Sequence, residues 1–267
     1  MKRFLTFFAA VILFAAVLCG CGGEDTTADY PVTVGGCTLD KAPSKVAVLF
    51  RQAADAVCMM GGGIRLCGVP NGYLSEDAPA AVSVGTVAAP DIERIKAVSP
   101  DVLITTSFTS DIALSELYDV GIKVVRLDAP YLQSELPEFY SSLGIVLSGN
   151  VSGKSAAENS YEILKSNVKA AAEKYSIPNE PMNAAFVSQG SYEFGDDTLI
   201  AELFSVCGLK IGKTPEIVVC DTSSESKAAE KYPSARIITV EFSANDLCGN
   251  DAVSAVKSLC RALYGEK

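Results

Sequence analysis

The chain has 267 residues, of which 49% are hydrophobic and 20% charged, so it can bury a substantial core in one large domain or two smaller ones. Its 22 basic and 32 acidic residues leave a net charge of −10, which argues against nucleic acid as a partner. It contains no histidine, which excludes catalytic pairs and metal sites that depend on imidazole.

The N-terminal segment differs in composition from the rest of the chain. Lys2 and Arg3 precede an apolar run, Phe4–Leu18, which is too short to span a bilayer. The run ends in Leu-Cys-Gly-Cys, which resembles the lipobox of bacterial lipoproteins, with a small residue just before Cys21. We therefore expect residues 1–20 to be a signal peptide and Cys21 to carry a lipid anchor on the extracytoplasmic face of the cell membrane. An ordinary secretory signal and a membrane helix are the alternatives.

Residues 21–30 are rich in glycine and acidic residues and predict a flexible tether. Without residues 1–20, 20 basic residues stand against 32 acidic ones, a net charge of −12. Anionic lipid would repel such a surface, so association with the membrane is expected to depend on acylation of Cys21.

Seven cysteines follow Cys21, an odd number that cannot all pair within one chain. They show no C-x-x-C spacing, and most lie in apolar runs, where a thiol behaves as a small hydrophobe. We expect most of them to be reduced core residues, with a thiolate metal site as the alternative. The seven are Cys37, Cys58, Cys67, Cys207, Cys220, Cys248 and Cys260.

Residues 31–150 alternate apolar strand-like runs with amphipathic helical runs, which predicts an N-terminal α/β lobe with a parallel sheet. The predicted strands are Val46–Phe50, Leu66–Val69, Val102–Thr105 and Val124–Leu127. The predicted helices are Ala53–Met60, Asp91–Val98, Ile112–Val120 and Ser134–Leu147.

Residues 151–178 predict one long linking helix, because apolar residues recur every three or four positions from Ser152 to Tyr175. We expect Ser152 or Ser155 to cap it, with Glu158 completing a capping box. The preceding Gly149–Ser155 segment ends like a phosphate-binding loop, but it has three residues between its glycines where four are required.

Residues 179–267 repeat the strand and helix alternation and predict a C-terminal α/β lobe. The predicted strands are Ala184–Ser188, Ile217–Cys220 and Ile237–Val240. The predicted helices are Thr198–Cys207, Ser224–Tyr232 and Asp251–Leu263.

The order of several short motifs resembles the class III substrate-binding proteins of ABC importers, which carry ferric siderophores, haem, cobalamin or metal ions. The most specific motif is Val84-Gly85-Thr86 followed by Pro90–Ile104, a glycine, a helix with a glutamate, and a Pro-Asp-hydrophobic strand. Leu199–Gly208 in the second half is also similar. The resemblance implies a monomer of two α/β lobes with parallel sheets, joined by one long helix. It implies a ligand held between the lobes and an ABC permease as partner.

Ligands of parallel sheets bind at the carboxyl ends of strands, so the loops there hold the candidate contacts. Arg51 could pair with a carboxylate or an anionic complex, although it could equally be a solvated helix-start residue. The tyrosines and phenylalanines suit a flat or macrocyclic ligand, and a bare divalent cation is disfavoured without histidine. The predicted ligand-binding residues are Arg51, Gln52, Tyr73, Phe108, Thr109, Tyr131, Tyr192 and Phe194.

The resemblance also places Glu93 where the family docks to its permease. The equivalent in the second lobe is missing, because the chain between Gly208 and Pro215 is short; Glu216 is an unaligned substitute. We therefore expect a lipid-anchored receptor that delivers a metal chelate, haem or corrinoid to an importer. The alternative is a surface sensory or adhesion lipoprotein that keeps the fold without import. Neither catalysis nor a cofactor is expected, because no spacing selects a pair of acids for general acid–base work.

Overall fold

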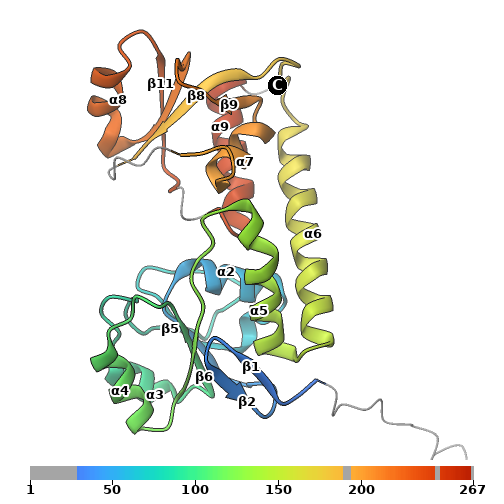
Figure 1. Ribbon diagram of the computed structural model, residues 1–267, viewed down its shortest axis with the longest axis vertical. Helices are drawn as coiled ribbons and strands as arrows, with labels where there is room; N and C mark the ends of the chain where they lie inside the picture. The colour runs from blue at the N-terminus through green and yellow to red at the C-terminus, as the bar shows by residue number, and fades with distance from the viewer. Residues whose placement is uncertain (1–28, 189–193, 244–246, 266–267) are drawn as a thin grey trace, which may run out of the picture.

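The computed structural model describes residues 29–188, 194–243 and 247–265, which form two α/β lobes (Figure 1). The fold predicted from the sequence is confirmed: each lobe has its own parallel sheet, and one long helix joins them. Within these residues, no helix has the length and apolar character needed to cross a membrane.

The N-terminal lobe has a five-stranded parallel sheet in the order β5-β4-β3-β6-β7. Its central strands are buried along their whole length, as expected of strands covered on both faces. The strands are β3 (Val46–Val48), β4 (Leu66–Val69), β5 (Val82–Ser83), β6 (Val102–Thr105) and β7 (Lys123–Arg126). The helices are α2 (Arg51–Met59), the 3-10 turn η2 (Gly63–Arg65), α3 (Ile92–Val98) and α4 (Asp111–Asp119).

A two-stranded antiparallel hairpin, β1 (Val32–Val34) and β2 (Cys37–Leu39), precedes this sheet. Gly35 turns the hairpin at a φ of 54°, and its carbonyl accepts a hydrogen bond from the Arg126 amide at 3.1 Å. A Cβ at Gly35 would overlap the Arg126 backbone, so glycine allows the hairpin to pack against the end of β7.

The C-terminal lobe has a four-stranded parallel sheet in the order β11-β10-β8-β9. The strands are β8 (Met182–Val187), β9 (Leu209–Ile211), β10 (Ile217–Asp221) and β11 (Arg236–Val240). The helices are α7 (Leu199–Val206), the 3-10 turn η4 (Thr222–Ser224), α8 (Glu225–Lys231) and α9 (Asn250–Tyr264).

Strand β9 was not predicted from the sequence. It accounts for the shortness of the chain between Gly208 and Pro215, because this segment forms a sheet strand and not a helix. It pairs with the first half of β8, whereas β10 pairs with β8 from Ala184 onward, so the chain needs no long return between them. The link between β9 and β10 crosses β8 at Asn183, whose carbonyl accepts from the Glu216 amide at 2.9 Å. The link passes close to this residue, because a Cβ at Gly212 would lie 2.9 Å from the Asn183 side-chain oxygen. A five-residue link therefore replaces a helical crossover.

Helix α6 (Ser152–Ala172) is the unbroken link between the lobes, and it ends three residues before the predicted Tyr175. Figure 1 shows it alongside α5 (Leu136–Ser148) in its lower half and α9 in its upper half. Its 21 residues span roughly 32 Å at ~1.5 Å per residue. One hydrophobic core extends along these helices through both lobes, from Leu143 on α5 to Leu164 on α6 and Leu259 on α9.

The expected capping box of α6 is wrong. The carboxylate of Asp29 caps the helix from outside, accepting from the amides of Val151 at 2.7 Å and Ser152 at 3.0 Å. Asp29 and Tyr30 were assigned to the tether, but the Tyr30 hydroxyl also donates to the Val146 carbonyl at 3.1 Å. A through-space carboxylate satisfies the free amides of the first turn, so these two residues belong to the folded domain.

Candidate functional site

The carboxyl ends of the two sheets are brought toward each other by contacts between α2 and the start of α9. Strand β3 leads directly into α2, where Nε of Arg51 lies 3.0 Å from Oδ2 of Asp251 on α9. The chain after β11 returns to the same region, where the Tyr140 hydroxyl on α5 donates to the Cys248 carbonyl at 2.7 Å. The strand ends of each lobe therefore face the other lobe.

A second link between the lobes is the segment 127–135, here called the crossing segment, which runs from β7 through the 3-10 turn η3 (Gln133–Glu135) to α5. The Leu199 amide donates to the Tyr131 carbonyl at 3.1 Å, and the Gln133 amide donates to the Asp197 carbonyl at 2.9 Å. The Glu135 carboxylate accepts from the Tyr131 amide at 2.8 Å. Tyr131 is thus held at the junction of the lobes, and the residue is 42% exposed.

Phe194 lies beside Tyr131, with ring centroids 6.2 Å apart, but is itself buried. Its ring meets Phe186 of β8 edge-on at 5.1 Å, and Phe242, after β11, also stacks on Phe186, with ring centroids 6.4 Å apart. Phe194 therefore supports an aromatic cluster at the strand ends of the C-terminal lobe and leaves Tyr131 as the accessible ring.

Arg51 and Gln52 lie in the first turn of α2, because the helix begins two residues earlier than predicted. The Arg51 guanidinium lies 5.5 Å from the ring centroid of Tyr73 and also forms the ion pair with Asp251. Tyr73 is buried and donates its hydroxyl to Asp55 at 2.9 Å, and burial raises the pKa of Tyr73. Arg51 is therefore a cation with an internal carboxylate partner, and Tyr73 is its support.

The loop after β6 exposes one of its two predicted residues and buries the other. Phe108 is 82% exposed. Thr109 is buried, and its hydroxyl shares a hydrogen bond of 2.5 Å with Thr105. The Ser107 amide donates to Asp128 at 2.8 Å, which ties this loop to the crossing segment. Phe108 therefore projects from a loop whose backbone is held in place.

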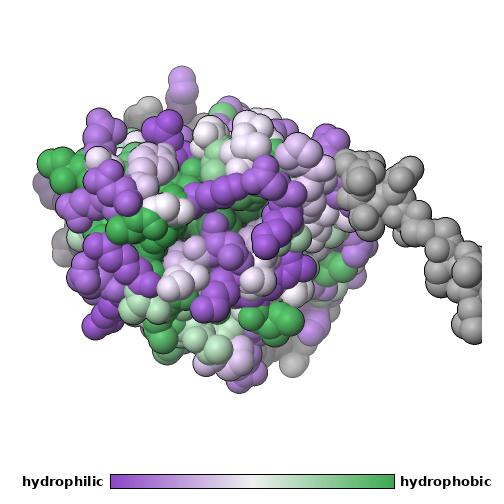
Figure 2. Space-filling model, turned by 90° about the horizontal axis from the view of Figure 1, so that it is seen from below, coloured by the Kyte–Doolittle hydropathy of each residue, from purple (hydrophilic) through white to green (hydrophobic). Residues whose placement is uncertain are grey.

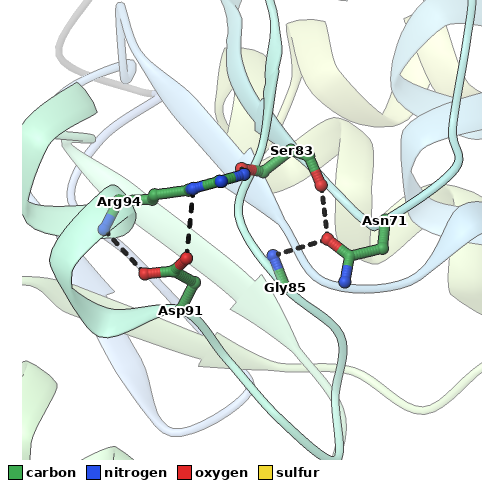
Figure 3. A network of polar contacts seen from close by, with 5 residues as sticks. All are labelled: Asn71, Ser83, Gly85, Asp91 and Arg94. Atoms are coloured by element: carbon green, nitrogen blue, oxygen red, sulfur yellow. Dashed lines mark hydrogen bonds and ion pairs between the residues drawn. The ribbon is translucent and has the colours of Figure 1, made fainter.

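The loop after β4 is held by the polar network of Figure 3. Oδ1 of Asn71 accepts from the Gly85 amide at 3.2 Å and from the Ser83 hydroxyl, while Arg94 pairs with the α3 cap Asp91 at 3.1 Å. Gly85 has a φ of 99°, and a Cβ there would lie 2.5 Å from the Asp91 amide nitrogen. This accounts physically for the glycine of the Val-Gly-Thr motif.

A cavity of about 380 Å³ lies between the crossing segment and α5. Its polar lining includes the acids Asp128, Glu135 and Glu138, and its apolar lining includes Phe139.

Figure 2 shows the end of the molecule seen from below, where hydrophilic residues are interspersed with apolar ones. In the described part of the chain, no group of three or more cysteine, aspartate or glutamate side chains converges as a metal site.

The remaining predicted residues lie away from this junction or outside the described residues. Glu93 is exposed on α3 and pairs with Lys96 at 3.0 Å. Glu216 is exposed at the amino end of β10, the end opposite the junction. Tyr192 and Cys21 lie outside the described residues.

Sequence reasoning missed Asp251, the ion-pair partner of Arg51, and Asp55, which accepts from the Tyr73 hydroxyl. Asp55 had a signal, because it follows Arg51 by four residues and so shares its helix face. Asp251 had none, since it is 200 residues from Arg51 along the chain.

No family model and no curated protein matches the sequence. A possible iron-binding periplasmic solute-binding protein from Staphylococcus epidermidis has a similar structure, with a TM-score of 0.65 at 16% identity over 84% of this chain and 100% of the other. A periplasmic haem-binding protein from Pseudomonas aeruginosa has a TM-score of 0.60 at 18% identity, over 84% and 94%. A periplasmic vitamin B12-binding protein from Vibrio cholerae has a TM-score of 0.53 at 14% identity, over 83% and 96%. The chain therefore has the two-lobed α/β fold that these solute-binding proteins share.

Proposed function

We propose that the chain is a lipid-anchored extracytoplasmic substrate-binding protein, which delivers an iron-siderophore, haem or cobalamin-like ligand to an ABC importer. The observation that carries this proposal is the meeting of two sets of strand ends at the junction of α2, α9 and the crossing segment. Ligands of parallel α/β sheets bind at such ends. Proteins with this fold include ones described as binding iron, haem and vitamin B12.

The ligand site in this proposal has two kinds of residue. Arg51, Gln52, Phe108 and Tyr131 are the contacts, because their side chains are at least partly exposed at the strand ends. Tyr73, Thr109 and Phe194 are buried and hold these contacts in place. Tyr192 belongs to the proposed contacts on sequence grounds alone.

The test of ligand binding is a thermal-shift panel on the soluble chain from Gly22 onward, with haem, cobalamin and ferric siderophores. Because a ligand that binds only the folded state raises the melting temperature, at least one should stabilise the chain. Arg51→Ala should reduce that stabilisation, whereas Arg261→Ala, on the exposed side of α9, should leave it unchanged. A flat response to the whole panel would refute the proposal.

The anchor and the delivery step need separate tests. Cys21→Ser should release the protein from the membrane fraction of cells, because the lipid anchor on Cys21 would then be lost. Glu93→Lys should lower uptake of the ligand by cells without changing its affinity, whereas Glu173→Lys, exposed near the far end of α6, should change neither.

The short link between β9 and β10 favours a second function, a surface sensory or adhesion lipoprotein without a permease. In the described part of the C-terminal lobe, no helix lies between β9 and β10 to carry an acid equivalent to Glu93. Uptake of the ligand by cells that lack the chain separates the two functions. Uptake falls if the chain is a receptor and is unchanged if it is a sensor.

A further inference from the structure

The positive charge at the strand ends is small and partly neutralised. The segments that follow β3 to β8, β10 and β11, up to the first turn of the next helix, contain only three cations, Arg51, Arg94 and Lys227. Arg94 is paired with the α3 cap Asp91 at 3.1 Å. The Arg51 guanidinium is paired with Asp251 at 3.0 Å, and Lys227 lies on the exposed side of α8. An anionic ligand at the centre of the junction would have to compete with Asp251 for the Arg51 guanidinium.

Acidic side chains are numerous in the same segments of both lobes. In the N-terminal lobe, Asp111 is exposed at the start of α4, and Asp128 is exposed in the crossing segment. In the C-terminal lobe, Asp221 ends β10, and Glu241 is exposed directly after β11. The nearby cavity adds Glu135 and Glu138, so both walls of the junction carry negative charge.

Apolar side chains stand exposed among these acids. Phe108 is 82% exposed and Ile112, in the first turn of α4, is 75% exposed. Tyr131, from the next strand end, presents a partly exposed ring. Large apolar side chains gathered at a strand-end surface mark a place where an organic ligand buries them.

We propose that this site selects its ligand by charge, taking neutral or cationic chelates with an apolar skeleton and rejecting polyanionic ones. The inference rests on the proposed function and adds a substrate class to it. A polyanion at the junction meets several carboxylates and one neutralised arginine, and low-dielectric walls strengthen that repulsion. A trihydroxamate chelate, with neutral iron-binding groups linked by alkyl chains, has the complementary chemistry.

The experiment compares affinities of the soluble chain for probes of different charge, by fluorescence quenching. The probes are ferrichrome and cobalamin (neutral), ferrioxamine B (cationic), ferric enterobactin (trianionic) and haem (dianionic). A neutral or cationic probe should bind at least about tenfold more tightly than either anion, a difference of about 1.4 kcal/mol. If an anionic probe binds as tightly or more tightly, the charge selection is wrong and the receptor function stands. If no probe binds, the receptor function itself fails.

A pair of matched variants tests whether the local acids are responsible. Asp111→Asn with Glu241→Gln removes two charges at the junction. Glu158→Gln with Glu173→Gln removes two exposed charges along α6, one within the helix and one at its C-terminal cap. The first pair should improve affinity for ferric enterobactin about threefold or more, and the second should change it less than twofold, because exposed charges beyond about 10 Å are screened. Equal changes in both pairs, with both variants melting as the parent does, would overturn the inference.

Discussion

The contact between α5 and α6 at Gly144 and Gly153 offers a sharp test of how the lobes are joined. A Cβ at Gly153 would lie 2.8 Å from the Ile145 amide nitrogen and would overlap the Gly144 carbonyl. A Cβ at Gly144 would lie 2.9 Å from the Ala157 Cβ and would overlap the Gly153 carbonyl oxygen. The neighbours are mostly backbone, so no change of rotamer relieves these overlaps, and the two helices have to move apart.

We therefore predict that Gly153→Ala destabilises the chain. Overpacking costs about 1–3 kcal/mol. The higher helix propensity of alanine offsets less than ~1 kcal/mol of this, because Gly153 is in the first turn. The net loss is about 1–2 kcal/mol, and a chain of this size loses roughly 2–4 °C in melting temperature per kcal/mol. Thermal unfolding followed by circular dichroism should show a melting temperature lower by about 2–8 °C.

The control for Gly153→Ala is Ser166→Ala, on the exposed face of the same helix. It introduces the same residue without a close neighbour, so the free energy of unfolding should change by no more than about 0.5 kcal/mol. If Gly153→Ala melts at or above the temperature of the parent chain, the close approach of α5 and α6 is not what holds them together.

Three further predictions concern other contacts between distant segments. Asp29→Asn should lower the melting temperature at neutral pH. The hydrogen bond from the Ser152 side chain lowers the pKa of Asp29 below its usual 3.8. The difference in melting temperature between variant and parent should therefore be full above about pH 4 and vanish as pH falls through the folded-state pKa. The side chains of Arg51 and Asp251 are 40% and 37% exposed, so a double-mutant cycle in urea should yield a coupling free energy of at most about 1 kcal/mol. A larger coupling free energy would mean that solvent screens the ion pair less than this exposure implies. Tyr140→Phe should lower the free energy of unfolding by about 1–2 kcal/mol, because its buried hydroxyl donates to a carbonyl of the C-terminal lobe at 2.7 Å; an unchanged urea midpoint would contradict that bond.

The sequence predicted the elements well where local pattern determines them. Strands β4 and β6 have the predicted bounds, and α6 begins at the predicted residue, because burial on both faces or on one helical face leaves a regular apolar pattern. Strand β9 escaped prediction because three residues are too few to show a period. The expected cap of α6 was wrong because a serine near a helix start satisfies the same rule as Asp29, which reaches the helix through space.

For the candidate site, the sequence by itself determined which loops follow the strands, and hence which residues stand near the junction. Only the tertiary structure decided which of their side chains are available to a ligand. Tyr73, Thr109 and Phe194 are buried, and Arg51 is paired with an acid from the other lobe, 200 residues away. The physical reason is that periodicity reports which face of an element is covered, whereas the partner of a polar or aromatic side chain depends on distances between segments that the pattern does not encode.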